Sequence, residues 1–311
     1  MTTVSPRHER NLEGIEDYDI AWRWSDRQRS TGMTAVMRVK NEARSLPWVL
    51  PGLLRSVERI VLIDNESTDG TPDVAERIAK ELDRADRLDV FSYPFAVSRC
   101  GSEHLHTPAD SVHSLTYFYN WSFSHVDTHY ALKWDGDMVL TYEGERILRD
   151  LSWQFEAADA VMPIPRIPVY IESADVAYLD LGIEHFEPCG WPNTPRYRFA
   201  KGFEWEVPVR PDNVPVRIMP GNICFEMKWL DGDEFANWTG NDFVTSERAS
   251  RKQRDWRLFT ALNNGEQPDE LERIERGSAP HVIEKIRATR RAEYETMTGS
   301  FWDRVGLSDR F

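Results

Sequence analysis

The sequence lacks several features that would place it in other classes of protein. It has no run of about 18 apolar residues, so no segment is long enough to cross a bilayer as a helix. Its three cysteines, Cys100, Cys189 and Cys224, have no paired spacing, which argues against a disulfide framework or a zinc site and favours reduced thiols. Residues 1–11 are polar and lack the apolar segment of a signal peptide. Together these absences predict a cytoplasmic protein without a transmembrane segment.

Basic side chains are in the minority. The 38 Lys and Arg residues face 52 Asp and Glu residues, for a formal net charge of -14. Nucleic acids and anionic membranes bind to basic surfaces, so we expect no nucleic-acid partner. The sequence also has no internal repeat, low-complexity run or clear linker, and its 311 residues can bury the core of one large unit.

The most informative motif is Asp-Gly-Asp at 135–137, which follows an apolar run at 130–134. Side chains of a strand repeat with period two, so an extended backbone would present Lys133, Asp135 and Asp137 on one side. Mg²⁺ or Mn²⁺ is usually held by one or two carboxylates together with substrate phosphates. Gly136 would let such a ligand approach the backbone. The alternative is an Asp-Gly turn after a strand, with both acids solvated.

Two further strand-and-loop motifs lie upstream. The apolar run 59–63 ends in an acidic loop, Asp-Asn-Glu-Ser-Thr-Asp-Gly-Thr at 64–71, before a helical pattern that begins at Pro72. The run Val-Met-Arg-Val-Lys at 36–40 ends in Asn41 and Glu42.

These three motifs, in this order, resemble those of the family 2 glycosyltransferases and their GT-A fold. The family has a strand followed by Asn-Glu, then a strand that ends in Asp-Asp-x-Ser-x-Asp-Gly-Thr, then Asp-x-Asp. The resemblance covers roughly residues 33–165 and fades beyond. The sequence departs from the family at Asn65, where a second Asp is most common, and at 117–121, which replaces the usual Ala-Arg-Asn.

The resemblance implies an inverting hexosyltransferase that moves a sugar from a nucleotide-diphosphate donor to a hydroxyl of a saccharide or glycoconjugate acceptor. It places Mn²⁺ or Mg²⁺ at Asp135 and Asp137, where the metal would stabilise the diphosphate leaving group. Carried over residue by residue, the family's remaining donor contacts fall on Asn41, Glu42, Asp64 and Asn65. Independently of the family, Arg38 and Lys40 are candidates for phosphate contacts or for solvated side chains, and Asp69 is expected to cap the turn before the Pro72 helix.

The general base has no clean match to the family pattern, and neither has the family's late metal-binding His. The candidates are Glu184, Glu187 and Asp233. We favour Glu187, because Phe186, Pro188 and Trp191 would desolvate its carboxylate and raise its pKa, and Trp191 could stack on the acceptor sugar. The histidines in the loop 94–110, His104 and His106, are interpreted as solvated rather than as a metal pair.

Strand and helix alternate through the first half, which predicts an α/β fold of the GT-A type: a mainly parallel central sheet flanked by helices, with a C-terminal helical extension. We expect an N-terminal arm at 1–32 that packs through Tyr18, Trp22 and Trp24, a nucleotide-sugar-binding half at 33–165, an acceptor-side half at 166–248 and the helical extension at 249–311. A helix is expected from about Ser45, with Pro47 in its first turn and a kink or break at Pro51, and further helices at 249–262 and 279–297. A strand is expected at 160–164, and the recurring prolines at 163–220 favour hairpins and irregular segments.

A nucleotidyltransferase would use a similar sheet, but no Gly-rich basic loop lies near the N-terminus. A non-catalytic carbohydrate-binding protein would account for the 12 tryptophans, most of which are equally well explained as core residues.

Overall fold

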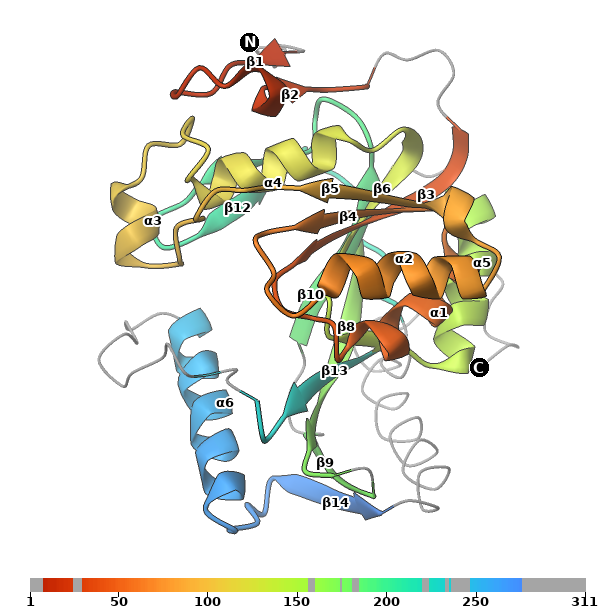
Figure 1. The fold of residues 1–311 in the computed structure, drawn as a ribbon, viewed down its shortest axis with the longest axis vertical. Coiled ribbons are helices and arrows are strands. Elements are labelled where there is room, and N and C mark those ends of the chain that lie inside the picture. Colours follow the sequence, from red (N-terminus) through yellow and green to blue (C-terminus); the bar gives the residue numbers. More distant parts are fainter. Residues whose placement is uncertain are drawn as a thin grey trace. The chain divides into compact units, whose positions relative to one another are not determined.

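The computed structural model describes residues 8–24, 30–155, 160–173, 175–180, 185–219, 224–232, 235 and 247–275 (Figure 1). The chain divides into two compact units. The first comprises Met1–Gly136, Leu140–Ile164 and Glu187–Met219, and the second comprises Asp137–Val139, Pro165–Phe186 and Pro220–Phe311. No helix in the described part of the chain is long and apolar enough to span a bilayer.

The first unit is built on a parallel sheet, as the alternation of strands and helices predicts. β3 lies between β4 and β6, both parallel to it, and β5 is parallel to β4 at the edge. β10 pairs antiparallel with the other edge of β6. The bounds are β3 Ser30–Val39, β4 Arg59–Asp64, β5 Leu88–Ser92, β6 Thr128–Trp134 and β10 His185–Pro192. The strands at 60–64 and 131–134 therefore belong to one sheet, and the predicted fold class is confirmed.

Helices cover both faces of this sheet (Figure 1). α1 (Leu46–Ser56) packs against α2 (Thr71–Glu81) and α5 (Tyr142–Phe155) on one face. α4 (Leu115–Ser124) lies on the other face, where it packs on β3. Pro47 occupies the first turn of α1, as expected, but Pro51 lies inside the helix and does not end it.

The α4 face of the sheet holds an aromatic core. Strand residues such as Val36, Val61 and Ile63 belong to the same buried cluster as the α4 side chains Tyr117 and Trp121. The N-terminal arm closes this core, which confirms its predicted packing through Tyr18, Trp22 and Trp24: the rings of the last two stack with centroids 4.2 Å apart. Within the arm, β1 (His8–Glu9) pairs with β2 (Ile20–Ala21), and the short 3-10 helix η1 spans Glu16–Tyr18.

The proline-rich segment forms more regular strands than its composition suggests. β8 (Met162–Ile171) passes from the first unit into the second and extends well beyond the predicted strand 160–164. β11 (Arg198–Lys201) and β12 (Glu206–Val209) form a hairpin in the first unit. The loop 94–110 contains a short helix, α3 (Ser102–His106). His106 is exposed, as expected, but the interpretation of His104 as solvated is wrong, because this side chain is buried with Nε2 3.3 Å from the Gly202 carbonyl oxygen.

The second unit combines a small sheet with a long helix. β13 (Cys224–Trp229) pairs with β7 (Met138–Leu140) and runs parallel to β8, while β9 (Val176–Asp180) pairs antiparallel with β8 and with β14 (Leu271–Glu275). α6 (Glu247–Asn263) buries Leu258 against Tyr170. The helix predicted at 249–262 is thus confirmed, the strand at β14 was not predicted, and the helix predicted at 279–297 lies outside the described residues.

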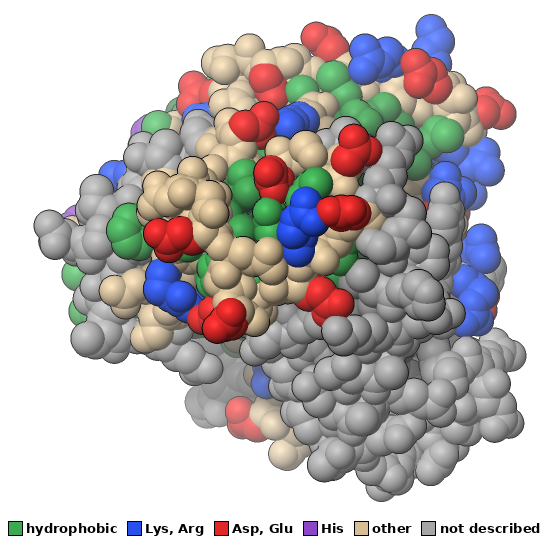
Figure 2. Space-filling view, turned by 90° about the horizontal axis from the view of Figure 1, so that it is seen from below, with side chains coloured by type: hydrophobic (Ala, Val, Ile, Leu, Met, Phe, Trp, Pro, Cys, Tyr) green, Lys and Arg blue, Asp and Glu red, His purple; other side chains and the backbone are tan. Residues whose placement is uncertain are grey.

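The face of the molecule in Figure 2 shows how the excess of acidic groups is distributed. Toward its centre, acidic side chains (red) predominate over basic ones (blue). This view agrees with the formal net charge of -14. The absence of a nucleic-acid partner, which we inferred from that charge, stays a prediction.

Candidate functional site

The loops that follow β3 and β4 are locked together by hydrogen bonds at the carboxyl edge of the first unit's sheet. Three consecutive backbone N–H groups of the first loop donate to side chains of the second. Asn41 donates to Ser67 Oγ (2.8 Å), Glu42 to Thr71 Oγ1 (2.8 Å) and Ala43 to Asp69 Oδ2 (2.9 Å). The first two sequence motifs thus form one structural element.

The side chains of Asn41 and Asp69 form hydrogen bonds within this element. Asn41 adopts a left-handed backbone (φ 59°), and its Oδ1 accepts from the N–H of Thr68 at 2.8 Å. Asp69 Oδ1 accepts from the N–H and the hydroxyl of Thr71, as expected for a residue that caps the start of α2. Burial raises the pKa of Asp69, but the hydrogen bonds from Thr71 and Ala43 outweigh burial and lower it.

Asp64 is the last residue of β4, and its two carboxylate oxygens differ in their hydrogen bonding. Oδ2 accepts from the N–H of Ser67 at 3.3 Å. Oδ1 is buried and has no hydrogen-bond partner among the described residues. A buried acceptor without a partner costs free energy, and a ribose hydroxyl or a base N–H would satisfy it.

Asn65, where the sequence departs from the family pattern, has a structural role that an aspartate cannot fill. Its Nδ2 donates to the carbonyls of Tyr93 and Phe95, both at 2.8 Å, and so holds the loop after β5. A carboxylate has no donor for these two carbonyl oxygens. The assignment of Asn65 to the donor site remains a prediction that rests on its Oδ1 alone.

Asp135 follows β6 and lies between two cations. Lys133 Nζ is 3.2 Å from Asp135 Oδ2, which confirms that these two side chains share a face. Arg38 Nη2 is 3.6 Å from Asp135 Oδ1. The side chains of Arg38 and Lys133 are only 6% and 8% exposed, whereas that of Asp135 is 30% exposed, so the carboxylate is the accessible member of the group.

Arg38 is held by an aromatic residue that sequence analysis did not single out. Its Cζ lies 3.3 Å from the ring centroid of Tyr119 in α4, a close cation–π contact. Its Nε and Nη1 atoms are buried and have no hydrogen-bond partner among the described residues. Tyr119 belongs to the segment 117–121 that replaces the family's Ala-Arg-Asn, so this departure supplies the platform for Arg38. An anion such as a phosphate would accept hydrogen bonds from the N–H groups of these two nitrogens.

The backbone of the Asp-Gly-Asp motif is a turn and not an extended strand. β6 ends at Trp134, Gly136 and Asp137 form the turn, and β7 begins at Met138. The side-chain alternation that we used to place Asp137 beside Asp135 therefore does not extend through the turn to Asp137. Gly136 is required here for space, because a Cβ atom would lie 2.7 Å from Glu42 Cγ and 3.0 Å from Val39 Cγ1.

Asp137 belongs to the second unit, where its carbonyl accepts a hydrogen bond from the N–H of Met227 at 2.9 Å. The boundary between the two units falls directly after Gly136. Asp137 is partly exposed, as is Asp135.

The partly exposed carboxylate of Asp135 could give a hard divalent cation some of its ligands, but not a complete site. Carboxylate oxygens at a glycine turn are suitable ligands for Mg²⁺ or Mn²⁺. The described residues contain no cluster of three or more His, Cys, Asp or Glu side chains that would hold a metal without further ligands. Arg38 and Lys133 both lie within 4 Å of the Asp135 carboxylate, so a metal held there would need phosphate oxygens for its remaining ligands.

The candidates for the general base stay predictions. Glu187 lies in β10, and its side chain is outside what the structure describes, as are Glu184 and Asp233 altogether. Trp191 is only 9% exposed and packs against Phe123 and Phe199, with ring centroids 4.8 and 5.8 Å away. Our suggestion that Trp191 stacks on the acceptor sugar is therefore wrong, because both neighbours already cover its ring.

Comparisons with known proteins give likenesses in structure only. No family model and no curated protein matches the sequence. The chain is similar to S. aureus TarS 1-349, with 13% identity, a TM-score of 0.41 and coverage of 63% of this chain and 60% of that one. It is also similar to the mannosyltransferase PcManGT from Pyrobaculum calidifontis in complex with GDP-Man and Mn²⁺, with 12% identity, a TM-score of 0.39 and coverage of 80% and 69%. A third is glucosyl-3-phosphoglycerate synthase from Mycobacterium tuberculosis with Mg²⁺ and UDP, with 14% identity, a TM-score of 0.29 and coverage of 44% of each chain.

Proposed function

We propose that the protein is a nucleotide-sugar-dependent glycosyltransferase whose donor site lies at the carboxyl edge of the first unit's sheet. The observation that carries this proposal is the arrangement of Asp64 and Asp135 on either side of β3. Val39 of β3 is in register with Asp64, and Met37 is in register with Trp134, next to Asp135. The two carboxylates are thus about two strand spacings, or roughly 10 Å, apart.

A nucleoside diphosphate has groups that match this arrangement. The buried, unpartnered Oδ1 of Asp64 would accept from the ribose or the base, and Arg38 and Lys133 would bind the diphosphate. Ligands of parallel α/β sheets bind outside the carboxyl ends of the strands, which is where these groups lie.

In the proposed reaction, the acceptor hydroxyl attacks the anomeric carbon and the nucleoside diphosphate leaves from the opposite face, with inversion. Arg38 and Lys133 would stabilise the negative charge that develops on the leaving group. Asp135 and Asp137 would hold Mn²⁺ or Mg²⁺, which supplies Lewis-acid stabilisation of the same charge. A carboxylate, Glu187 or Asp233, would take the proton of the acceptor hydroxyl. We propose a hexose as the transferred sugar and a saccharide or glycoconjugate as the acceptor, in a cytoplasmic reaction.

The experiment that tests the donor site is calorimetric titration of UDP and GDP, each with and without Mn²⁺. We expect one of the two nucleotides to bind to the parent protein and to bind more tightly with the metal. Asp64→Ala should weaken binding of that nucleotide by about tenfold or more, because the variant leaves its hydrogen bond unmade. Asp73→Asn is the control, because Asp73 is an exposed residue in the first turn of α2.

A second measurement separates binding from turnover. Asp64→Ala should raise the donor KM more than it lowers kcat, the pattern of a contact made equally in ground and transition states. Failure of both nucleotides to bind to the parent protein would overturn the proposed function. An unchanged affinity in Asp64→Ala would overturn the assigned role of Asp64.

A further inference from the structure

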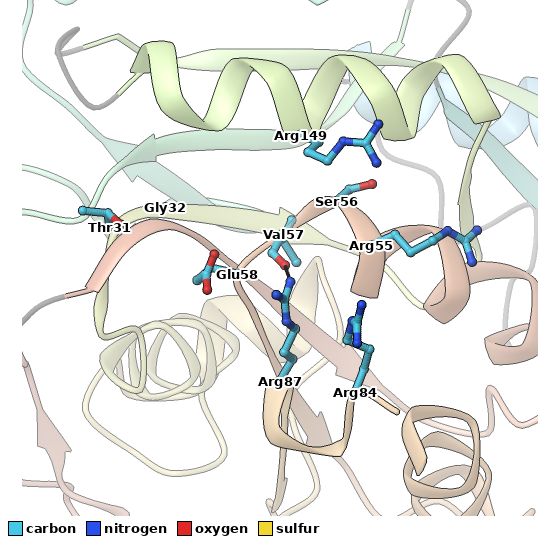
Figure 3. A pocket seen from close by; sticks show the side chains of 9 residues that line it. All are labelled: Thr31, Gly32, Arg55, Ser56, Val57, Glu58, Arg84, Arg87 and Arg149. Carbon is cyan, nitrogen blue, oxygen red and sulfur yellow. Dashed lines mark hydrogen bonds between the residues drawn. The ribbon is translucent and has the colours of Figure 1, made fainter. Parts of the chain in front are cut away.

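A cavity of about 440 Å³ lies at the amino edge of the same sheet, away from the proposed donor site. Its lining comes from the first residues of β3, from the end of α1 and the residues that join it to β4, from the segment before β5, and from α5 (Figure 3). Glu58 immediately precedes β4, whereas Asp64 ends it, so the strand separates the two by about 20 Å. The residues that line the cavity are Thr31, Gly32, Arg55, Ser56, Val57, Glu58, Arg84, Arg87 and Arg149.

The lining is basic in a protein that is acidic overall. The lining contains four arginines and one glutamate, although the whole chain has a formal charge of -14. Arg55 is already neutralised, because it binds Glu145 through two hydrogen bonds of 2.8 Å. The macrodipole at the end of α1 favours a cation there, and Arg55 fills that role.

Arg84 and Arg87 have no such neutralising partner. Arg84 Nη1 donates to the carbonyl of Asp83 at 2.8 Å, and Arg87 Nη1 donates to the carbonyl of Val57 at 3.4 Å. Neither forms an ion pair with a carboxylate among the described residues. The backbone bonds fix the direction of the two side chains, and Figure 3 shows both guanidinium groups projecting into the cavity from the same loop.

We propose that this cavity binds a phosphorylated, hydroxyl-bearing small molecule of the sugar phosphate class, with Arg84 and Arg87 as the ligands of its phosphoryl group. The planar guanidinium matches the oxygens of a phosphate and keeps its charge at all working pH values. The cavity is in the size range of small-molecule sites, which is larger than a lone phosphate needs.

Glu58 is the reason for proposing that the ligand bears hydroxyl groups as well as a phosphate. Its exposed carboxylate would repel an anion without hydroxyl groups, but it can accept hydrogen bonds from the hydroxyls of a sugar. The proposal does not depend on the glycosyltransferase function, because no cavity residue belongs to the donor site.

The test is calorimetric titration of the full-length protein with glucose 1-phosphate, inorganic phosphate and glucose, in EDTA and at about physiological salt so that exposed charges are screened. We expect glucose 1-phosphate to bind more tightly than inorganic phosphate, and glucose not to bind. The double variant Arg84→Gln/Arg87→Gln should weaken binding of glucose 1-phosphate by about tenfold or more, because two charge-assisted contacts are lost. Arg87→Lys, which keeps the charge, should lose less.

Two control variants locate the binding. Arg77→Gln removes a 63% exposed arginine of α2 that pairs with Glu81 outside the cavity, and should bind as the parent does. Asp64→Ala should also bind as the parent does, which separates this cavity from the donor site. Undiminished binding by the double variant, or no binding of glucose 1-phosphate by the parent at millimolar concentration, would overturn the proposal. Equal affinity for inorganic phosphate and glucose 1-phosphate would overturn the role given to Glu58.

Discussion

The side chain of Glu42 packs directly on Gly136, so closely that a Cβ atom on Gly136 would lie 2.7 Å from Glu42 Cγ. This contact joins the loop after β3 to the turn of the Asp-Gly-Asp motif. Both residues belong to the first unit, and Val39 Cγ1 closes the same space from the end of β3. The glycine is therefore fixed by packing within the protein as well as by the approach of a ligand.

Replacing Gly136 by alanine is expected to destabilise the protein by about 1–3 kcal/mol, the usual cost of an inserted methyl group in a packed site. Chemical denaturation measures this change. The double variant Gly136→Ala/Glu42→Ala should recover part of the loss, because the nearest atoms of Glu42 are then gone. A double variant as unstable as the sum of its two single variants would show that the contact with Glu42 is not the cause.

Lys133→Met is expected to change metal and nucleotide binding in opposite directions. Without Lys133, Asp135 loses its 3.2 Å cationic partner, so Mn²⁺ alone should bind more tightly than to the parent. Binding of the nucleoside diphosphate should weaken, because one cation is lost. Mn²⁺ titrations followed by electron paramagnetic resonance, with and without UDP or GDP, measure both effects. Metal affinity that stays the same in Lys133→Met would contradict the idea that Lys133 competes with the metal.

Asn65→Asp introduces the residue most common in the resembling family and is nevertheless expected to destabilise this chain. The carboxylate cannot donate to the carbonyls of Tyr93 and Phe95, which the Asn65 amide holds at 2.8 Å. Leaving such groups without a donor costs about 1–3 kcal/mol. The free energy of unfolding from denaturant titration provides the test, with Asp73→Asn as an exposed control. Unchanged stability would show that the loop after β5 does not depend on Asn65.

Glu226 in the second unit is expected to make stability depend on acid. Burial would raise its pKa, but Arg166 and Lys228 outweigh burial and lower the pKa from 4.5 to about 2. A carboxylate whose folded pKa lies below its unfolded value stabilises the fold fully above the unfolded pKa. That contribution is lost as the pH falls from about 4.5 to about 2, because the unfolded chain binds the proton first.

Glu226→Gln should remove this part of the acid dependence and should destabilise the protein by about 3–5 kcal/mol at neutral pH, because Arg166 and Lys228 stay buried without their carboxylate. Denaturant unfolding between pH 2 and pH 7 measures both effects. Glu270→Gln, which breaks an exposed pair with Arg257, is the matched control and should leave the free energy of unfolding nearly unchanged. If the free energy of unfolding of Glu226→Gln depends on pH as that of the parent does, other carboxylates cause the dependence.

The general base is tested by Glu187→Gln and Asp233→Asn. The correct variant should keep nucleotide affinity, because the amide keeps the shape of the side chain, and should lower kcat by roughly 10²–10⁴. It should also lose the acid limb of the pH–rate profile. Steady-state kinetics over a range of pH decide between the two. If both variants work within a few fold of the parent, the base lies elsewhere in the chain.

The positions of the strands and helices along the first half of the chain could be predicted because they depend on local sequence. Apolar runs such as 59–63 ended in polar loops and alternated with helical patterns, and strands formed at these positions. The pairing of Lys133 with Asp135, the first residue after β6, followed from the same two-residue period. Pro51 showed the limit of a local rule, since packing of α1 against α2 and α5 kept the helix continuous through it.

The sequence by itself determined which residues end the strands and carry the charge, because period, turn residues and composition act over a few positions. Only the tertiary structure decided what these residues do. The stacking of Arg38 on Tyr119 brings together two residues that are 81 positions apart in the sequence (119 − 38). The cavity around Arg84 and Arg87 is lined by segments that lie far from one another along the chain. Asn41, Asn65 and Asp69 looked like ligand contacts or local caps, and the fold uses their side chains to hold loops in place. Such contacts depend on the path of the chain through space, and local sequence periodicity does not predict that path.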